Sequence, residues 1–147
     1  KSKNLDVGEV KSLDLETLEP LLRKKNFTFI NLQYGNTSDE LKKFEDKYNI
    51  KIITLKELDL FNDFEAISII LKKLKLFISV SNSTAHLAGA LGVPAFCATT
   101  VPNPWYLERT YDPFAQNTKV FCRPHNADWK PTIAALRENL TKTIIQP

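Results

Sequence analysis

The sequence predicts an α/β protein in which a Rossmann-like, doubly wound parallel sheet carries helices on both faces. Short apolar runs rich in β-favouring residues alternate along the chain with longer segments of helical periodicity, as they do in βα units. Strands that alternate with helices in this way are typical of a parallel sheet covered on both sides. One run, Leu76–Val80, leads directly into a helix of small residues. These features indicate one domain, or one lobe of a larger protein.

The expected elements follow in order along the chain. A polar arm or linker occupies residues 1–12, and one domain spans residues 13–147. Helices are expected where apolar residues recur at helical spacing, over Asp14–Lys25, Thr37–Tyr48, Asp63–Lys73, Ala85–Leu91 and Pro131–Ile144. Strands are expected at apolar, β-favouring runs, over Phe27–Leu32, Lys51–Leu55, Leu76–Val80, Ala95–Ala98 and Lys119–Cys122.

Boundary residues support these assignments. Pro20 marks a kink or boundary in the first helix. Thr37 with Glu40, and Asn62 with Glu65, have the spacing of capping boxes. Residues 99–118 contain three prolines and are expected to be irregular.

Composition limits the classes of function. A net charge of +3, scattered along the chain, is too small to favour nucleic-acid binding. No apolar stretch is long enough for a membrane span, and no signal peptide opens the chain. Cys97 and Cys122 fall in expected buried strands, which favours a reducing compartment such as the cytoplasm. Because the chain starts at Lys1 and has no methionine, we expect it to be a piece of a longer protein.

The junction after Leu76–Val80 is the strongest functional signal. Four small polar residues, Ser81 to Thr84, stand where the strand meets the next helix. The first turn of a helix has unsatisfied N–H groups and the positive end of the helix dipole. Hydroxyls around such a turn favour a phosphate site, and a nucleotide is the obvious ligand. The alternative is a well-capped core helix.

Other candidate residues lie near the same sheet edge. His86 is in the first turn of that helix, where the dipole favours a neutral imidazole, and it is either structural or functional. Gln33, Ser81–Thr84 and Thr99–Thr100 all follow strands, so we expect them to converge on one crevice at the carboxyl ends. Lys56, Glu57 and Asp59 follow the second strand, where simple solvent exposure is the alternative to ribose binding.

Several segments resemble a known family. SVSNSTAHLAGALGVP, residues 79–94, resembles the donor-binding motif of family-nine, heptosyltransferase-like glycosyltransferases, in the form found at the end of bacterial tetratricopeptide-repeat proteins. Flanking matches occur in the right order at residues 11–13, 29–33, 105–106 and 128–129. The family typically has Asp and Thr where this chain has Ser81 and Asn82, and a Gln where it has Arg123.

The resemblance implies the carboxyl-terminal lobe of an inverting GT-B glycosyltransferase. Such a lobe binds a nucleotide-sugar donor as substrate, without a catalytic metal or a further cofactor. The acceptor and the usual catalytic base would belong to an amino-terminal lobe that this chain lacks, and tetratricopeptide repeats would be further partners. The isolated chain is therefore expected to be inactive.

The resemblance also implies roles for individual residues. Ser83 and Thr84 would hold the donor diphosphate at the junction that begins with Ser81, and Asn82 would orient it. His86 would donate a hydrogen bond to a phosphate oxygen or the leaving group. Gln33 would reach the base, ribose or phosphate, unless it is a solvated loop residue. Trp105 and Tyr106 would cover the sugar or base, unless they are packing anchors.

Two other classes remain open. The chain can be a non-catalytic nucleotide-binding or scaffolding module attached to repeats, or a different Rossmann-like enzyme such as a sugar-nucleotide epimerase. The sequence has no G-x-G-x-x-G and no Walker motif, which argues against dinucleotide oxidoreductases and P-loop triphosphatases.

Overall fold

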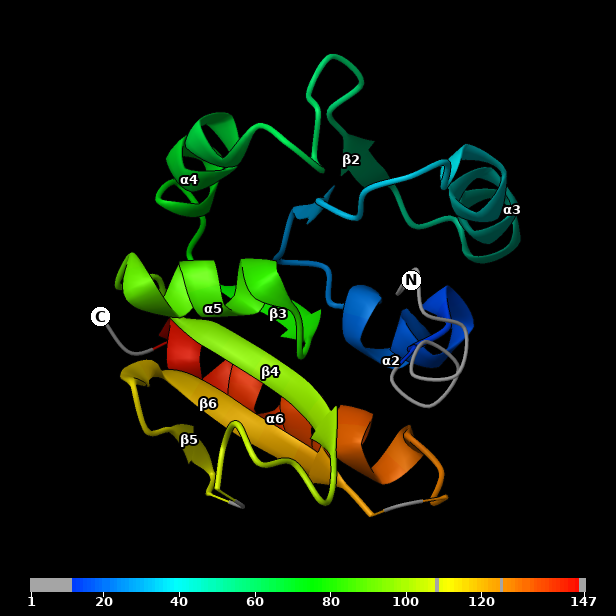
Figure 1. The fold of residues 1–147 in the computed structure, drawn as a ribbon. Helices are drawn as coiled ribbons and strands as arrows, with labels where there is room; N and C mark the ends of the chain where they lie inside the picture. Colours follow the sequence, from blue (N-terminus) through cyan, green and yellow to red (C-terminus); the bar gives the residue numbers. More distant parts are fainter. Residues whose placement is uncertain (1–11, 108, 125, 146–147) are drawn as a thin grey trace.

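The computed structural model describes residues 12–107, 109–124 and 126–145 (Figure 1). The helical elements are η1 (Leu15–Leu18), a 3₁₀ helix, and α2 (Glu19–Leu22), α3 (Ser38–Tyr48), α4 (Phe64–Leu71), α5 (Ser83–Ala90) and α6 (Lys130–Ile145). The strands are β1 (Phe29–Asn31), β2 (Ile52–Thr54), β3 (Phe77–Val80), β4 (Ala95–Thr100), β5 (Tyr111–Asp112) and β6 (Ala115–Arg123). The arm expected over residues 1–12 lies outside the described residues except for Ser12.

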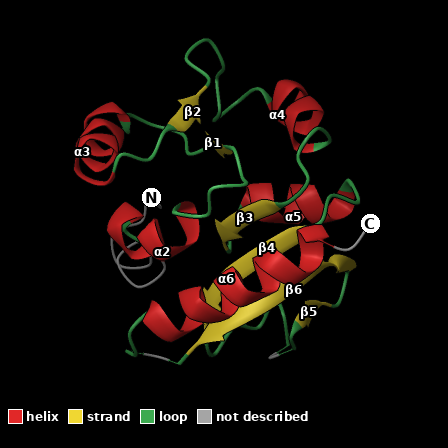
Figure 2. Ribbon diagram, turned by 180° about the vertical axis from the view of Figure 1, so that it is seen from behind, coloured by secondary structure: helices red, strands yellow, loops and turns green. Residues whose placement is uncertain are grey.

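The strands confirm the predicted α/β class with mainly parallel pairing. β3, β4 and β6 form a parallel sheet in the order β3-β4-β6-β5, with β5 antiparallel to β6. β1 and β2 form a second, parallel pair rather than extending this sheet. Figures 1 and 2 show this pair beyond β3, with α3 on one side and α4 on the other.

The centre of the molecule is β4, which is buried at all six positions. Ala95 and Cys97 face a core cluster that includes residues of α4 and α5. Phe96 and Ala98 face a second cluster that includes α2 and α6. α5 and α6 accordingly lie on opposite faces of the sheet, α5 in front in Figure 1 and α6 in front in Figure 2. Burial on both faces explains why this strand is continuously apolar until its last two residues.

Helix α5 packs very closely on strand β6. A Cβ atom at Gly89 would lie 2.8 Å from Ala115 Cβ and 3.0 Å from Thr118 Oγ1. Ala85 and Ala88 on the same helix are also buried. Small residues are therefore needed on this face, because larger ones would push α5, and the site at its first turn, away from the sheet.

The predicted irregular stretch over residues 99–118 is wrong in extent. β4 continues through Thr100, and residues 111–123 form an antiparallel hairpin in which β6 begins at Ala115. The amino-terminal half of β6 is polar, so its sequence has no strand signal. It is a strand because Ala115 pairs with Asp112 of β5 and, from Thr118 onward, β6 pairs with β4, Thr118 opposite Ala95.

The predicted capping boxes are also wrong. Thr37 precedes α3 but makes no side-chain cap, and its hydroxyl instead accepts a hydrogen bond from Asn31 Nδ2 at 3.0 Å. Helix α4 is capped by Asp63 rather than Asn62, with Asp63 Oδ1 accepting from the backbone N–H of Ala66 at 2.9 Å. The Thr37 hydroxyl is engaged by Asn31 and the Asn62 side chain by Asp59, so neither forms the predicted cap.

Candidate functional site

The carboxyl ends of β3 and β4 carry the predicted phosphate-binding residues. Val80 pairs with Ala98, so Ser81 and Thr99 follow at neighbouring strand ends. Asn82 is the N-cap of α5: its Oδ1 accepts from the backbone N–H of Ala85 at 2.9 Å, and its Nδ2 donates to Ser79 Oγ at 2.8 Å. The Asn82 side chain is thus engaged in building the strand–helix junction.

Ser83 and Thr84 are the first two residues of α5. Within the described part of the chain, neither their backbone N–H groups nor their hydroxyls have a hydrogen-bond partner. Ser83 is exposed and Thr84 is half-buried. These donors stand at the positive end of the helix dipole, so they are available to an anionic ligand.

The ring of His86 lies among aromatic side chains from the loop after β4. It stacks on Tyr106, with ring centroids 5.7 Å apart and planes 20° apart, and lies 5.8 Å from the centroid of Trp105. The loop is anchored by the buried Asn103, which donates to Thr99 Oγ1 and accepts from the Trp105 backbone N–H at 3.1 Å. Tyr106 is 1% exposed, whereas Trp105 is 63% exposed. Tyr106 is therefore the packing anchor, and Trp105 is the ring open to a ligand.

The Tyr106 hydroxyl is part of a buried polar group. It lies 3.1 Å from Cys97 Sγ and hydrogen-bonds to the Ser81 side chain. Burial, together with the neighbouring Cys97, raises the pKa of Tyr106 well above its usual value of 10. The phenol is therefore neutral in the folded protein at physiological pH, and this contact ties the Ser81 junction to the loop that carries Trp105.

Because the pKa of Tyr106 is raised, the stability of the fold should decrease at alkaline pH. Since the pKa of Tyr106 is higher in the folded than in the unfolded state, its contribution is complete below pH 10 and is lost as pH rises further. We expect the free energy of unfolding to fall by up to about 1.4 kcal/mol per pH unit above pH 10 from this group. Urea unfolding from pH 8 to pH 11 measures the loss. Tyr106→Phe should show a shallower decline, and an identical decline would contradict the assignment.

Asp112 is a site residue that the sequence analysis missed. It is 3% exposed, and its Oδ1 accepts from the backbone N–H of Phe114 at 2.8 Å. Its Oδ2 lies 3.7 Å from His86 Nδ1. The local signal at this position in the sequence is the Asp112-Pro113 pair, which is typical of a turn. It does not indicate that Asp112 lies near His86.

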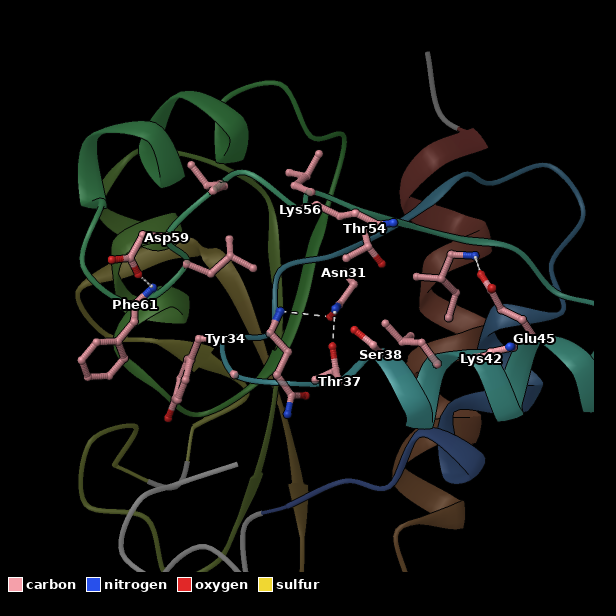
Figure 3. Close-up of a pocket in the computed structure, with 17 residues that line it drawn as sticks. Asn31, Tyr34, Thr37, Ser38, Lys42, Glu45, Thr54, Lys56, Asp59 and Phe61 are labelled. Atoms are coloured by element: carbon pink, nitrogen blue, oxygen red, sulfur yellow. Dashed lines mark hydrogen bonds between the residues drawn. The ribbon is translucent and has the colours of Figure 1, made fainter.

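Gln33 lies at a different place, beside a cavity of about 670 Å³ at the carboxyl ends of β1 and β2. Figure 3 shows side chains around this cavity, including Tyr34, Lys42, Lys56 and Asp59. The Gln33 backbone N–H donates to Asn31 Oδ1 at 3.0 Å, and the residue is exposed. None of residues 81–86 lines the cavity. The structure thus brings Ser81–Thr84 and Thr99–Thr100 to neighbouring strand ends and leaves Gln33 at a separate cavity.

Of the three candidate residues after β2, two line this cavity. Lys56 and Asp59 line the cavity, whereas Glu57 is an exposed residue outside its lining. The Asp59 carboxylate accepts hydrogen bonds from the backbone of Phe61 and from Asn62, which lowers its pKa. Asp59 therefore holds its own loop and is an ionised group at the cavity wall.

Comparisons with known proteins give one similarity. No family model matches the chain, and no solved structure matches it. Protein FlbA of Caulobacter vibrioides is 30% identical over 115 residues, which cover 78% of this chain and 19% of FlbA. The chain thus spans about a fifth of the length of this relative.

Two structural features, a membrane-spanning helix and a metal-binding cluster, are not found among the described residues. None of their helices is both long enough and apolar enough to cross a membrane. They contain no cluster of three or more His, Cys, Asp or Glu side chains that could hold a metal ion. Cys97 and Cys122, both in the described part, are thiols rather than half-cystines.

Proposed function

We propose that this chain is the donor-binding domain of a GT-B glycosyltransferase, which holds a nucleotide-sugar while a second lobe supplies the acceptor. The observation that carries the proposal is the first turn of α5. Its Ser83 and Thr84 donors are without partners in the described part of the chain, beside the half-exposed His86 and the exposed ring of Trp105. Donors at a helix start suit a diphosphate, and an exposed aromatic ring suits a sugar or base.

The chemistry proposed for this turn is electrostatic. Negative charge grows on the departing nucleoside diphosphate as the bond to the sugar breaks, and fixed N–H and O–H donors stabilise that charge. Asn82 acts by holding the turn rather than by touching the ligand, because its side chain already caps the helix. The cavity beside Gln33 falls within the size range of small-molecule sites, about 300 to 1,000 Å³, but none of residues 81–86 lines it, so the diphosphate is not placed there.

Further parts of the proposal concern what lies outside this chain. An amino-terminal lobe would supply the acceptor site and the catalytic base, and tetratricopeptide repeats would be attached partners. The short share of FlbA that the chain matches agrees with a module of a longer protein. The two thiols support a reducing compartment, so we place the activity in the cytoplasm.

A second candidate is a scaffolding module without catalysis. Large apolar side chains are exposed at Phe61, Phe64 and Phe114, which are 46%, 53% and 86% exposed. Individually exposed rings are common on protein surfaces, so these side chains permit contact with another protein without requiring it. This reading needs no ligand at α5.

A heteronuclear NMR titration separates the two candidates. The chain is titrated with UDP, GDP, ADP and CMP, with their sugar conjugates, and with inorganic pyrophosphate as the control for simple anion binding. The proposal expects shifts at residues 81–86 with one nucleotide at lower concentration than with pyrophosphate, weakened about tenfold or more in Ser83→Ala/His86→Ala, because two ligand contacts worth about 1 kcal/mol each are lost. No shift with any nucleotide at millimolar concentration would favour the scaffold.

A further inference from the structure

The buried carboxylate of Asp112 faces one nitrogen of His86. Asp112 Oδ2 lies 3.7 Å from His86 Nδ1, which is within ion-pair range and longer than a direct hydrogen bond. Such contacts at binding sites commonly tighten when a ligand arrives. The Asp112 side chain is only 4% exposed, so its carboxyl group is largely shielded from water.

Two aromatic side chains also lie close to the imidazole ring. Its face stacks on the buried Tyr106, and Trp105 lies beside it. Asp112 is itself fixed, because its Oδ1 accepts the backbone N–H of Phe114. Ser83 stands three residues before His86 on α5 and therefore shares its face of the helix.

We propose that Asp112 is a positioning residue for His86, which keeps the proton of the neutral ring on Nδ1 and leaves the Nε2 lone pair for a hydroxyl group of the ligand. The second oxygen of a buried carboxylate can only accept, so the Nδ1–H form is the one that it stabilises. The neutral ring then accepts from a sugar or ribose hydroxyl through Nε2. This differs from the role implied by the family resemblance, in which His86 donates to a phosphate oxygen. The ligand chemistry rests on the proposed function, whereas the position of the proton does not.

Asp112→Asn is the substitution that tests this proposal. In Asp112→Asn the amide oxygen is held at the Oδ1 position by the Phe114 N–H, so the amide NH₂ faces His86 Nδ1. That NH₂ can only donate, and it therefore stabilises the opposite tautomer, with the proton on Nε2. In the serine-protease triad, the matching Asp-to-Asn change acts through the wrong histidine tautomer. Tyr106→Phe is the matched control, because it keeps the stacked ring and leaves Asp112 unchanged.

The experiment reads the two ring nitrogens of His86 by ¹⁵N NMR at a pH where the ring is neutral, without any ligand. Protonated and unprotonated imidazole nitrogens differ widely in chemical shift, and the His86 signals are assigned from their loss in His86→Gln. We expect Nδ1 to be protonated in the wild-type chain and in Tyr106→Phe, and Nε2 to be protonated in Asp112→Asn.

A wild-type spectrum dominated by the Nε2–H form would overturn the proposal, and so would the same tautomer in wild type and Asp112→Asn. The wild-type spectrum is decisive by itself should Asp112→Asn fail to fold. Since no nucleotide is present, failure of nucleotide binding leaves this result untouched. Conversely, nucleotide binding with the Nε2–H tautomer would retain the proposed function and reject the role of Asp112.

Discussion

Ser83→Asp is expected to weaken anion binding at α5 by about tenfold or more while leaving the fold as stable as before or more stable. Ser83 is the first residue of α5 and is exposed. A carboxylate in the first turn of a helix interacts favourably with the dipole, by about 0.3 to 1 kcal/mol. The same carboxylate lies where the ligand phosphate is proposed to bind. Each pair of unit charges about 4 Å apart costs about 1 kcal/mol in water and more near a protein surface. Against a diphosphate, affinity should fall by about tenfold or more.

The opposite signs of the two effects make this substitution informative. Thermal unfolding measures stability, and titration with the nucleotide that binds best measures affinity. Ser83→Asn is the control, because it has nearly the size of Asp without the charge, and it should retain most of the binding. Equal affinity in Ser83→Asp and wild type would mean that the anion does not bind at this turn, and the phosphate-site hypothesis would be rejected.

The β3–α5 junction could be predicted from the sequence because its signals are local. An apolar run, an N-cap residue, a stretch of small residues and Gly92 succeed one another directly. In the structure Asn82 caps the helix and Gly92 has a φ of +73°, a conformation that glycine adopts readily. Thr37 is the N-cap residue of α3 as expected, but its side chain and that of Asn62 bind neighbouring polar side chains instead of capping a helix, and sequence spacing does not show this.

The other features of the fold depend on long-range strand pairing, which limited what the sequence could predict. The polar start of β6 is a strand through its pairing with β5, before the ladder with β4 begins at Thr118, and no local sequence pattern shows that pairing. Whether β1 and β2 join the larger sheet likewise depends on which strand edges pair, and local sequence patterns do not show this. For the site, Trp105 and His86 were both candidates, and the structure places their rings 5.8 Å apart. Asp112 reaches His86 only because β5 folds back on β6.

Gly89→Val is expected to have the largest effect on stability. A Cβ at this position would lie 2.8 Å from Ala115 Cβ, an atom fixed directly to the backbone of β6, so neither partner can rotate away. Overpacking of this kind typically costs about 1 to 3 kcal/mol, and a β-branched side chain against a strand should fall near the upper end. Since small domains are stable by only about 5 to 15 kcal/mol, a loss of this size is readily measured by urea unfolding.

Ala90→Val separates the clash from helix propensity. Ala90 is the exposed neighbour on the same helix, so its substitution introduces the same β-branched side chain without the contact to β6. We expect Ala90→Val to cost well under 1 kcal/mol. The close approach of α5 to β6 also sets the distance between His86 on the helix and Asp112 on the hairpin. Gly89→Val should therefore change the His86 tautomer as well as stability, whereas Ala90→Val should leave the tautomer unchanged. Equal losses of stability in the two variants would show that α5 can move away from the sheet freely, and a site built on its first turn would then lack a fixed geometry.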